Sequence, residues 1–174
     1  MIVLGIDPGT ATTGYGVVLN KNGKLSAETW GLIETNKEHD PSRRLRNIYK
    51  EMNFLLSKHN PDIVAIEKIF FATNAKTAIR VGQALGVMLL STTRYKADVY
   101  EYAPGTIKKM VAGSGRADKK EMQQSIRKVF GNKVRSEAKK KTHFDNAADG
   151  LAVALCHFYS IDNTLIGGDK NGES

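Results

Sequence analysis

Cysteine is almost absent from this chain of 174 residues. Cys156 is the only cysteine, so no disulfide can form within the chain, and a reducing, cytoplasmic location is expected. It lies in the apolar run ALCHF, which predicts a buried, inert thiol and not a nucleophile.

Long apolar runs are also missing. No run approaches the roughly 20 residues that a membrane span needs, which excludes a membrane-spanning class of protein. The start, MIVLGID, lacks the basic region and cleavage site of a signal peptide. No internal repeat or linker appears either, so we expect one domain over residues 1–160 and a polar, disordered tail over residues 161–174.

Acidic residues are outnumbered by basic ones. Lysine and arginine total 26 against 18 aspartates and glutamates, which gives a net charge of +8. Such a surface favours a polyanionic partner such as nucleic acid, although charge alone does not exclude an ordinary solvated surface.

Periodic patterns predict an α/β domain. Three antiparallel strands are expected first, with Asn22-Gly23 as the turn between the second and third. Helices and strands then alternate, which predicts a mixed sheet covered by helices. The predicted strands are Ile2–Ile6, Thr13–Leu19, Lys24–Ile33, Asp62–Ile66 and Asp98–Tyr100; the predicted helices run from Pro41 to Asn60, Asn74 to Leu90, Thr106 to Val111, Lys119 to Phe130 and Asp145 to Tyr159.

Acidic residues stand at the ends of two predicted strands and in the last predicted helix. Asp7 and Glu67 follow apolar strands, and side chains at adjacent strand ends point into a common space. Asp149 shares a flank of its helix with Asn146, and Asp145 is one turn away. Spacing alone does not decide which of these two is the partner of Asp149.

An all-oxygen set of ligands predicts Mg²⁺, with Mn²⁺ as a possible substitute. On a basic protein it indicates phosphodiester hydrolysis with two metal ions per site. Taken singly, Asp149 is equally well a surface acid, and Glu67 could pair with Lys68 in solvent.

Four sequence blocks occur in order between Met1 and about Tyr159: GIDPGTATTGYGVV, AIEKIFFATNAKTAIRVGQALGV, YAPGTIKKMVAGSGRADKKEM and DNAADGLAVALCH. Together they resemble the RuvC family of bacterial Holliday-junction resolvases. The resemblance implies a ribonuclease H-like fold, a homodimer and Mg²⁺-dependent paired nicks at four-way DNA junctions. It also implies a preferred cleavage sequence and partnership with a branch-migration motor.

The same resemblance assigns catalytic, metal-holding roles to Asp7, Glu67 and Asp149, and a fourth such position falls on Asn146. The family usually has Asp there, and sometimes His. Asparagine keeps the shape and one carbonyl oxygen but loses the negative charge. Three explanations are open: an engineered inactivating substitution, which we favour, a natural variant, or Asp145 acting in its place.

Aromatic and basic residues near these acids predict DNA contacts. Phe70 and Phe71 are adjacent and point to different sides, so both cannot be core; the resemblance implies that Phe70 wedges against an unstacked base. The resemblance also puts Lys108 and Lys119 near the scissile phosphate. The complete predicted DNA-binding set is Phe70, Phe71, Asn74, Arg80, Lys108, Lys109, Arg116, Lys119, Lys120, Lys140 and Lys141.

Two further segments of the chain are basic. The turn Gly113-Ser114-Gly115 lacks the residue order of a P-loop and is interpreted as a basic loop that opens a helix and holds phosphates. Arg43, Arg44 and Arg46 begin an amphipathic helix and are interpreted as solvated surface.

Small residues form a stripe on the helix that starts at Asn74. Ala75, Ala78, Gly82 and Gly86 lie on nearly one face, which predicts close approach of another backbone. A two-fold dimer contact explains the stripe, and tight packing on the domain's own sheet is the alternative.

Three other functions compete with a junction nuclease. Asn146 favours a catalytically dead junction-binding protein. A short resolvase relative of the same fold is possible, although such proteins usually lack the Phe70-Phe71 and GQALGV blocks. The turn Asp7-Pro8-Gly9-Thr10 also resembles the phosphate loop of the sugar-kinase and actin superfamily, which needs a second domain and a second acidic-glycine loop that this chain lacks.

Overall fold

The computed structural model describes residues 1–9, 11–69, 75–131, 134 and 141–162, without the side chains of residues 141–146. Its strands are β1 (Ile2–Asp7), β2 (Thr12–Lys21), β3 (Lys24–Glu34), β4 (Ile63–Glu67) and β5 (Asp98–Tyr102). Its helices are α1 (Pro41–His59), α2 (Ala75–Thr92), α3 (Pro104–Ala112), α4 (Lys119–Phe130) and α5 (Lys141–Asp162).

The strands form one mixed sheet in the order β3-β2-β1-β4-β5. β1 pairs antiparallel with β2, and β2 with β3, while β4 runs parallel to both β1 and β5. Asn22 and Gly23 both have positive φ, as a tight turn between β2 and β3 requires. The predicted meander with added parallel strands, an α/β fold, is therefore confirmed.

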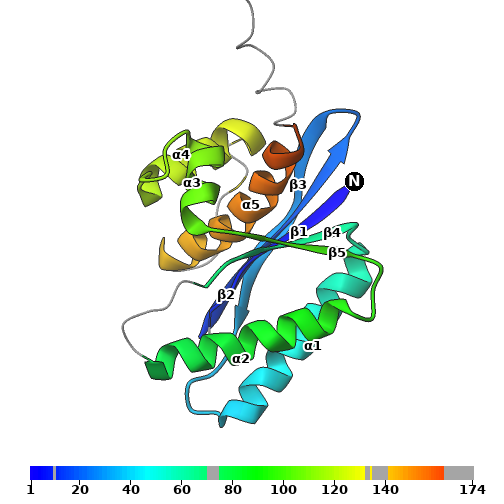
Figure 1. The fold of residues 1–174 in the computed structure, drawn as a ribbon, viewed down its shortest axis with the longest axis vertical. Coiled ribbons are helices and arrows are strands. Elements are labelled where there is room, and N and C mark those ends of the chain that lie inside the picture. Colours follow the sequence, from blue (N-terminus) through cyan, green and yellow to red (C-terminus); the bar gives the residue numbers. More distant parts are fainter. Residues whose placement is uncertain (10, 70–74, 132–133, 135–140, 163–174) are drawn as a thin grey trace, which may run out of the picture.

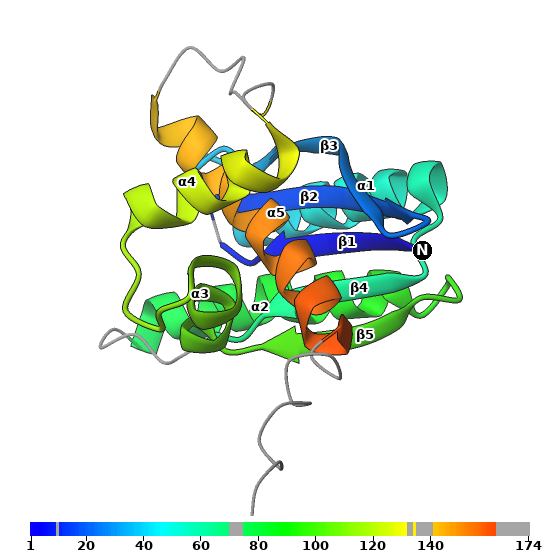
Figure 2. The ribbon, with the colours of Figure 1, turned by 90° about the horizontal axis from the view of Figure 1, so that it is seen from above.

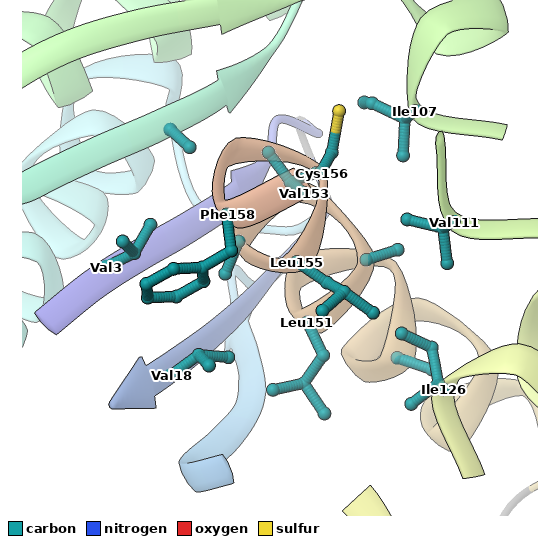
Figure 3. Packing of buried hydrophobic residues seen from close by; sticks show 14 of the residues in the cluster. Val3, Val18, Ile107, Val111, Ile126, Leu151, Val153, Leu155, Cys156 and Phe158 are labelled. Carbon is teal, nitrogen blue, oxygen red and sulfur yellow. The ribbon is translucent and has the colours of Figure 1, made fainter. Parts of the chain in front are cut away.

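Helices cover both faces of the sheet (Figure 1). α1 and α2 pack on one face over a core that includes Leu4, Ile6 and Met52. α3, α4 and α5 cover the other face, and α5 lies directly across β1 and β2 (Figure 2). On that side Phe158 lies beside Val3 and Val18 of the two strands (Figure 3).

Glycines let α5 approach the sheet unusually closely. A Cβ added to Gly150 would lie 2.4 Å from the carbonyl carbon of Tyr15, and one added to Gly5 would lie 2.2 Å from the carbonyl oxygen of Gly150. A Cβ on Gly16 would lie 2.6 Å from the backbone nitrogen of Leu151. Backbone therefore contacts backbone at this crossing, and larger residues would push the helix away.

Most predicted boundaries hold within two residues. Asp40 caps α1 by accepting a hydrogen bond from the Arg43 backbone N–H at 2.9 Å, and α1 ends at a left-handed Asn60. α5 is the exception, because it begins at Lys141, before the predicted start at Asp145, and continues to Asp162, beyond the predicted end at Tyr159. Residues 161 and 162, predicted as tail, are helical; residues 163–174 lie outside the described part of the chain.

Helix composition also bears on membrane insertion. None of the helices within the described residues combines the length and apolar character needed to cross a bilayer.

Candidate active site

Two carboxylates lie side by side at one edge of the sheet. Asp7 is the last residue of β1 and Glu67 the last of β4, and these parallel strands are in register up to the pair Ile6 and Ile66. Both strands are buried β-branched runs, so the acids appear where the chain leaves the core. The strand-end pattern in the sequence thus brings these two side chains to a common place.

The third carboxylate comes from α5. Every residue from Ala147 to Phe158 is buried except Asp149, which is partly exposed. Its neighbour Gly150 is pressed against the backbone of β2, and this fixes the position of Asp149 relative to the strand ends. The helix is buried on all sides because the sheet lies under it and α3 and α4 lie over it.

These acids share a cavity of about 250 Å³ with two lysines. Lys108 comes from α3 and Lys119 from the start of α4. The Lys119 Nζ lies 3.8 Å from the Asp149 Oδ2. The cavity is lined by Asp7, Glu67, Pro104, Ile107, Lys108, Asp118, Lys119, Met122, Asp149 and Ala152.

Local capping places Lys119 at the cavity. α3 ends at Gly113 in the left-handed conformation, with φ of 82°. α4 then begins with a capping box: the Glu121 backbone N–H donates to the Asp118 carboxylate at 2.8 Å, and the Asp118 backbone N–H donates to the Glu121 carboxylate at 2.7 Å. Lys119 is the first residue of this capped helix, so its backbone is fixed beside the cavity.

The acids repel one another across the cavity. The pKa of Asp7 is raised to about 7, mainly by burial and then by the charge of Asp149, while Lys119 opposes the shift. The pKa of Glu67 is also raised to about 7, mainly by burial and then by the charges of Asp7 and Asp149, while Lys108 opposes the shift. A bound cation would relieve this repulsion and return both groups to the ionised form.

The donor chemistry fits a hard divalent cation. Three carboxylates from separate elements face one cavity, and oxygen is the donor that Mg²⁺ and Mn²⁺ prefer. Within the described part of the chain, no three acidic, histidine or cysteine side chains already form a metal-binding group. The side chains of Asp145 and Asn146 lie outside the described residues, so the fourth ligand position is not placed.

Other predicted residues fall into three groups. Lys109, Arg116 and Lys120 are exposed on the α3 and α4 side but do not line the cavity. Arg80 is exposed on α2 and lines a separate hollow on the opposite face of the sheet. The predicted contacts outside the described residues or side chains are Phe70, Phe71, Asn74, Lys140 and Lys141.

The stripe on α2 does not pack on the sheet. Gly82 and Gly86 are exposed, and a Cβ added to either would meet nothing within 4 Å. Ala75 is exposed and Ala78 is partly so. The alternative of tight packing within the domain is therefore wrong.

Asp118 lines the cavity but was not predicted there, although the spacing Asp118-x-x-Glu121 before an amphipathic run indicates a helix start at this point. Arg43 and Arg46 are exposed and Arg44 is partly exposed, which agrees with the predicted solvated surface, and they also line a hollow with His39 and Lys50. Cys156 is buried as predicted, and burial raises the pKa of its thiol to about 12.

Comparison with known proteins identifies the family. The family model described as crossover junction endodeoxyribonuclease RuvC matches residues 3–157. The RuvC protein of Caldicellulosiruptor saccharolyticus is 42% identical over 98% of this chain and 99% of its own length, and that of Clostridioides difficile is 42% identical over 97% and 98%. A structure of T. thermophilus RuvC in complex with a Holliday junction substrate superposes with a TM-score of 0.80 at 31% identity, covering 92% of this chain and 94% of that one. The chain belongs to the RuvC family of crossover junction endodeoxyribonucleases.

Proposed function

We propose that this protein resolves four-way DNA junctions as a metal-dependent, homodimeric endonuclease that nicks two strands symmetrically. One observation carries the proposal: Asp7, Glu67 and Asp149 face one cavity together with two lysines, in a chain of the RuvC family. Acids that hold cations beside lysines that attract phosphate suit phosphodiester hydrolysis. The substrate of this protein would be cellular DNA, which agrees with the cytoplasmic location expected from the sequence.

Asp7 would hold both of two Mg²⁺ ions, with Glu67 and Asp149 each completing the coordination of one. When bound, such ions lower the pKa of the attacking water and stabilise the leaving 3′ oxygen. Asp7 suits the shared position because it lines the same cavity as both other acids, and its charge acts on the pKa of Glu67 while that of Asp149 acts on its own. Mn²⁺ would substitute, since the donors are all oxygen.

The two lysines would bind the scissile phosphate. Lys119 is half exposed, with 52% of its side chain accessible, and lies close to Asp149. Lys108 is partly buried and acts on the pKa of Glu67. They approach from separate helices, so the phosphate is held from two directions above the acids. Lys109, Arg116 and Lys120 on the exposed rim would contact neighbouring phosphates.

Asn146 supports a second candidate function, that of a protein that binds junctions without cutting them. A neutral amide in the fourth ligand position binds a cation less strongly than a carboxylate does, and a chain with that defect would bind junctions without cutting them. An engineered change, a natural variant and replacement by Asp145 all remain open as explanations. The predicted aromatic wedge at Phe70 likewise stays a prediction, as do the predicted DNA contacts of Phe71, Asn74, Lys140 and Lys141.

The exposed face of α2 supports a homodimer. Ile79 and Leu90 are 63% and 61% exposed, and Gly82 and Gly86 lie between them on the same stripe. An apolar stripe with two open glycines allows a second helix to approach closely. A symmetric dimer would present two cavities to the two strands of a symmetric junction. A branch-migration motor remains the partner implied by the family.

A labelled four-way junction and a linear duplex of the same sequence test the activity, each with and without Mg²⁺. We expect cutting of the junction alone, only with Mg²⁺, and faster cutting by Asn146→Asp. The Asp7→Asn variant should cut the junction more slowly than wild type by more than roughly 10–100-fold, the loss expected when a residue that only supports the metal ligands is replaced. Equal cutting of both DNAs would contradict the proposal, and an inert Asn146→Asp protein together with loss of activity in Asp145→Asn would assign the fourth position to Asp145.

Sedimentation of Ile79→Asp tests the dimer. We expect this variant to become monomeric and to leave nicks on one strand, because the charge would have to be buried in the contact. Phe54→Asp on α1 is the matched control, since Phe54 is also an exposed apolar side chain, at 56%. Monomers in both variants, or in neither, would contradict an α2 interface.

A further inference from the structure

A second basic surface lies on the face of the sheet opposite the candidate active site. It is a hollow of about 540 Å³ between the end of β3, the segment after it and the first half of α1. A smaller hollow of about 110 Å³ shares His39 and Arg44 with it and extends to Arg80 of α2. We name the two together the α1 groove.

Cations dominate the lining of the α1 groove. Across both hollows six lysines and arginines face a single acid, Glu34, whereas the whole chain has 26 basic and 18 acidic residues. Positive charge is therefore concentrated here well beyond the average for the molecule. The six are Lys37, Arg43, Arg44, Arg46, Lys50 and Arg80.

The arginines stand where the helix itself disfavours them. The N-terminus of a helix carries partial positive charge, so acids are usual there and cations are unfavourable. α1 has no acid within its first turn and instead carries Arg43 and Arg44, followed by Arg46. The Asp40 carboxylate already caps this helix end by accepting a hydrogen bond from the Arg43 backbone N–H, so the groups that would attract an anion here are the guanidinium groups and not the helix end.

Part of the groove is held in place by hydrogen bonds. The Arg44 Nε donates to the Thr35 hydroxyl at 3.0 Å, and the Asn47 amide donates to the Glu34 carbonyl oxygen at 2.9 Å. The end of β3 and the start of α1 are thereby joined. Arg43 and Arg46 remain exposed beside this fixed part and present guanidinium groups, which match the geometry of phosphate oxygens.

The groove and the candidate active site share an edge of the sheet. Glu34 at the end of β3 pairs with Thr12 of β2, and Gly14 of β2 pairs with Asp7. Both regions thus lie where β1, β3 and β4 end, on opposite faces of the sheet. A duplex arm that leaves the cavity and passes this edge would meet the arginines next.

We infer that the α1 groove binds backbone phosphates of a duplex arm of the junction, away from the phosphate that is cut. The inference rests on the proposed function, which supplies the DNA at this edge. It extends that function by giving the enzyme a second contact on each arm. This contact would depend on the charge and spacing of the phosphates and not on the base sequence. An acidic protein would also be attracted by the groove, and the experiment below distinguishes it from DNA.

The test measures junction affinity against salt in chelator, which prevents cutting. Arg43→Gln combined with Arg46→Gln should reduce the slope of log affinity against log salt by about 0.9 per lost phosphate contact, nearly 2 for the pair. The affinity lost between 50 and 200 mM salt then becomes about tenfold smaller. The matched control is Lys21→Gln combined with Lys24→Gln, which removes the same charge from the exposed hairpin at the other end of the sheet.

Arm length and thermal unfolding complete the test. Shortening the arms stepwise should remove the difference between the wild-type protein and the arginine variant, and the variant's Tm should be unchanged or slightly higher because two cations leave the helix N-terminus. If the slope of log affinity against log salt is unchanged in the arginine variant, or changes equally in the lysine control, the inference is overturned. An acidic protein then becomes the candidate partner of the groove. A wild-type protein with no preference for junctions overturns the proposed function instead.

Discussion

α5 and α2 lie on opposite faces of one sheet and use glycine in opposite ways. Gly150 of α5 lies against the backbone of Tyr15, and a Cβ there would lie 2.4 Å from it. Gly82 and Gly86 of α2 face open space. α5 is buried on all sides between Ala147 and Phe158 apart from Asp149, whereas α2 exposes Ile79 and Leu90.

This difference separates two roles within one domain. α5 holds Asp149 beside the strand ends, because Gly150 and the strand glycines Gly5 and Gly16 bring its backbone against the sheet. On α2, Gly82 and Gly86 face open space, where we propose that a second copy packs. The same residue type thus fixes the candidate active site on one face and opens a proposed contact on the other.

Gly150→Ala should disrupt the close packing of α5 on the sheet and have the largest effect on stability. The added Cβ would meet backbone atoms of Tyr15 and Gly16, which cannot rotate away, so the helix must shift. We expect a loss of about 3 kcal/mol, at the upper end for overpacking, and a Tm lower by about 6–12 °C. Calorimetry measures both.

Gly105→Ala on α3 is the control for this prediction. A Cβ on Gly105 meets nothing within 4 Å, so the same substitution in the same layer should leave Tm nearly unchanged. Equal losses in the two variants would show that the close approach of α5 to the sheet does not matter.

Asp7→Asn should stabilise the metal-free protein by about 2 kcal/mol at pH 8 and not at pH 4. The pKa of Asp7 rises from 3.8 to about 7 on folding, so the native state binds the extra proton and wild-type stability falls as pH rises from about 4 to about 7. The full shift would correspond to about 4 kcal/mol, and we halve it because solvent reaches the cavity. Denaturation in chelator at both pH values checks the sign.

Glu67 gives the companion measurement for this effect. Its pKa is raised to about 7 mainly by burial and then by Asp7, so part of its cost should disappear together with the Asp7 charge. Adding Mg²⁺ at pH 8 should stabilise the wild-type protein and leave Asp7→Asn nearly unchanged. A variant that gains as much at pH 4 as at pH 8 would contradict an electrostatic origin.

Much of the fold was predictable, because its signals are local. Asn22-Gly23 specifies the hairpin, Asp40 and Asn60 delimit α1, and the acids at the ends of β1 and β4 must lie together once the strands run parallel. The start of α5 was not predictable in the same way. The helix begins at Lys141, and the lysines at this point of the sequence show no apolar periodicity that would indicate a helix.

The contacts between distant elements were out of reach of the sequence. In the sequence, Gly5 and Gly16 look like ordinary strand residues. Only the close packing of α5 on the sheet shows why a side chain at either position would not fit. Arg43 and Arg46 were correctly predicted as exposed, but the sequence does not show that the fold brings Glu34 into the hollow that they line. Asp149 was predicted as the third acid with its partner left open between Asn146 and Asp145, and its position at the cavity comes from packing around Gly150.

Tyr102→Phe should weaken the far end of α5 by about 1–2 kcal/mol. The Tyr102 hydroxyl is 2.7 Å from His157 Nδ1 and 2.9 Å from Ser160 Oγ, and His157 is only 2% exposed. Removing the hydroxyl leaves a buried imidazole nitrogen without this partner. Urea denaturation measures the loss, with Tyr100→Phe as the control, because that exposed ring also packs against His157. Similar losses in both would contradict an origin in the hydrogen bonds of the Tyr102 hydroxyl.

Gly86→Ala should have the smallest effect and the opposite sign from Gly150→Ala. Alanine is favoured over glycine inside a helix by up to about 1 kcal/mol, and no atom obstructs a Cβ at this position, so the isolated subunit gains stability. If α2 meets a second copy closely at Gly86, the same methyl group weakens that contact. We therefore expect a higher Tm at low protein concentration together with a larger dimer dissociation constant in sedimentation. A variant that gains stability and keeps full self-association would place the dimer contact elsewhere than this glycine.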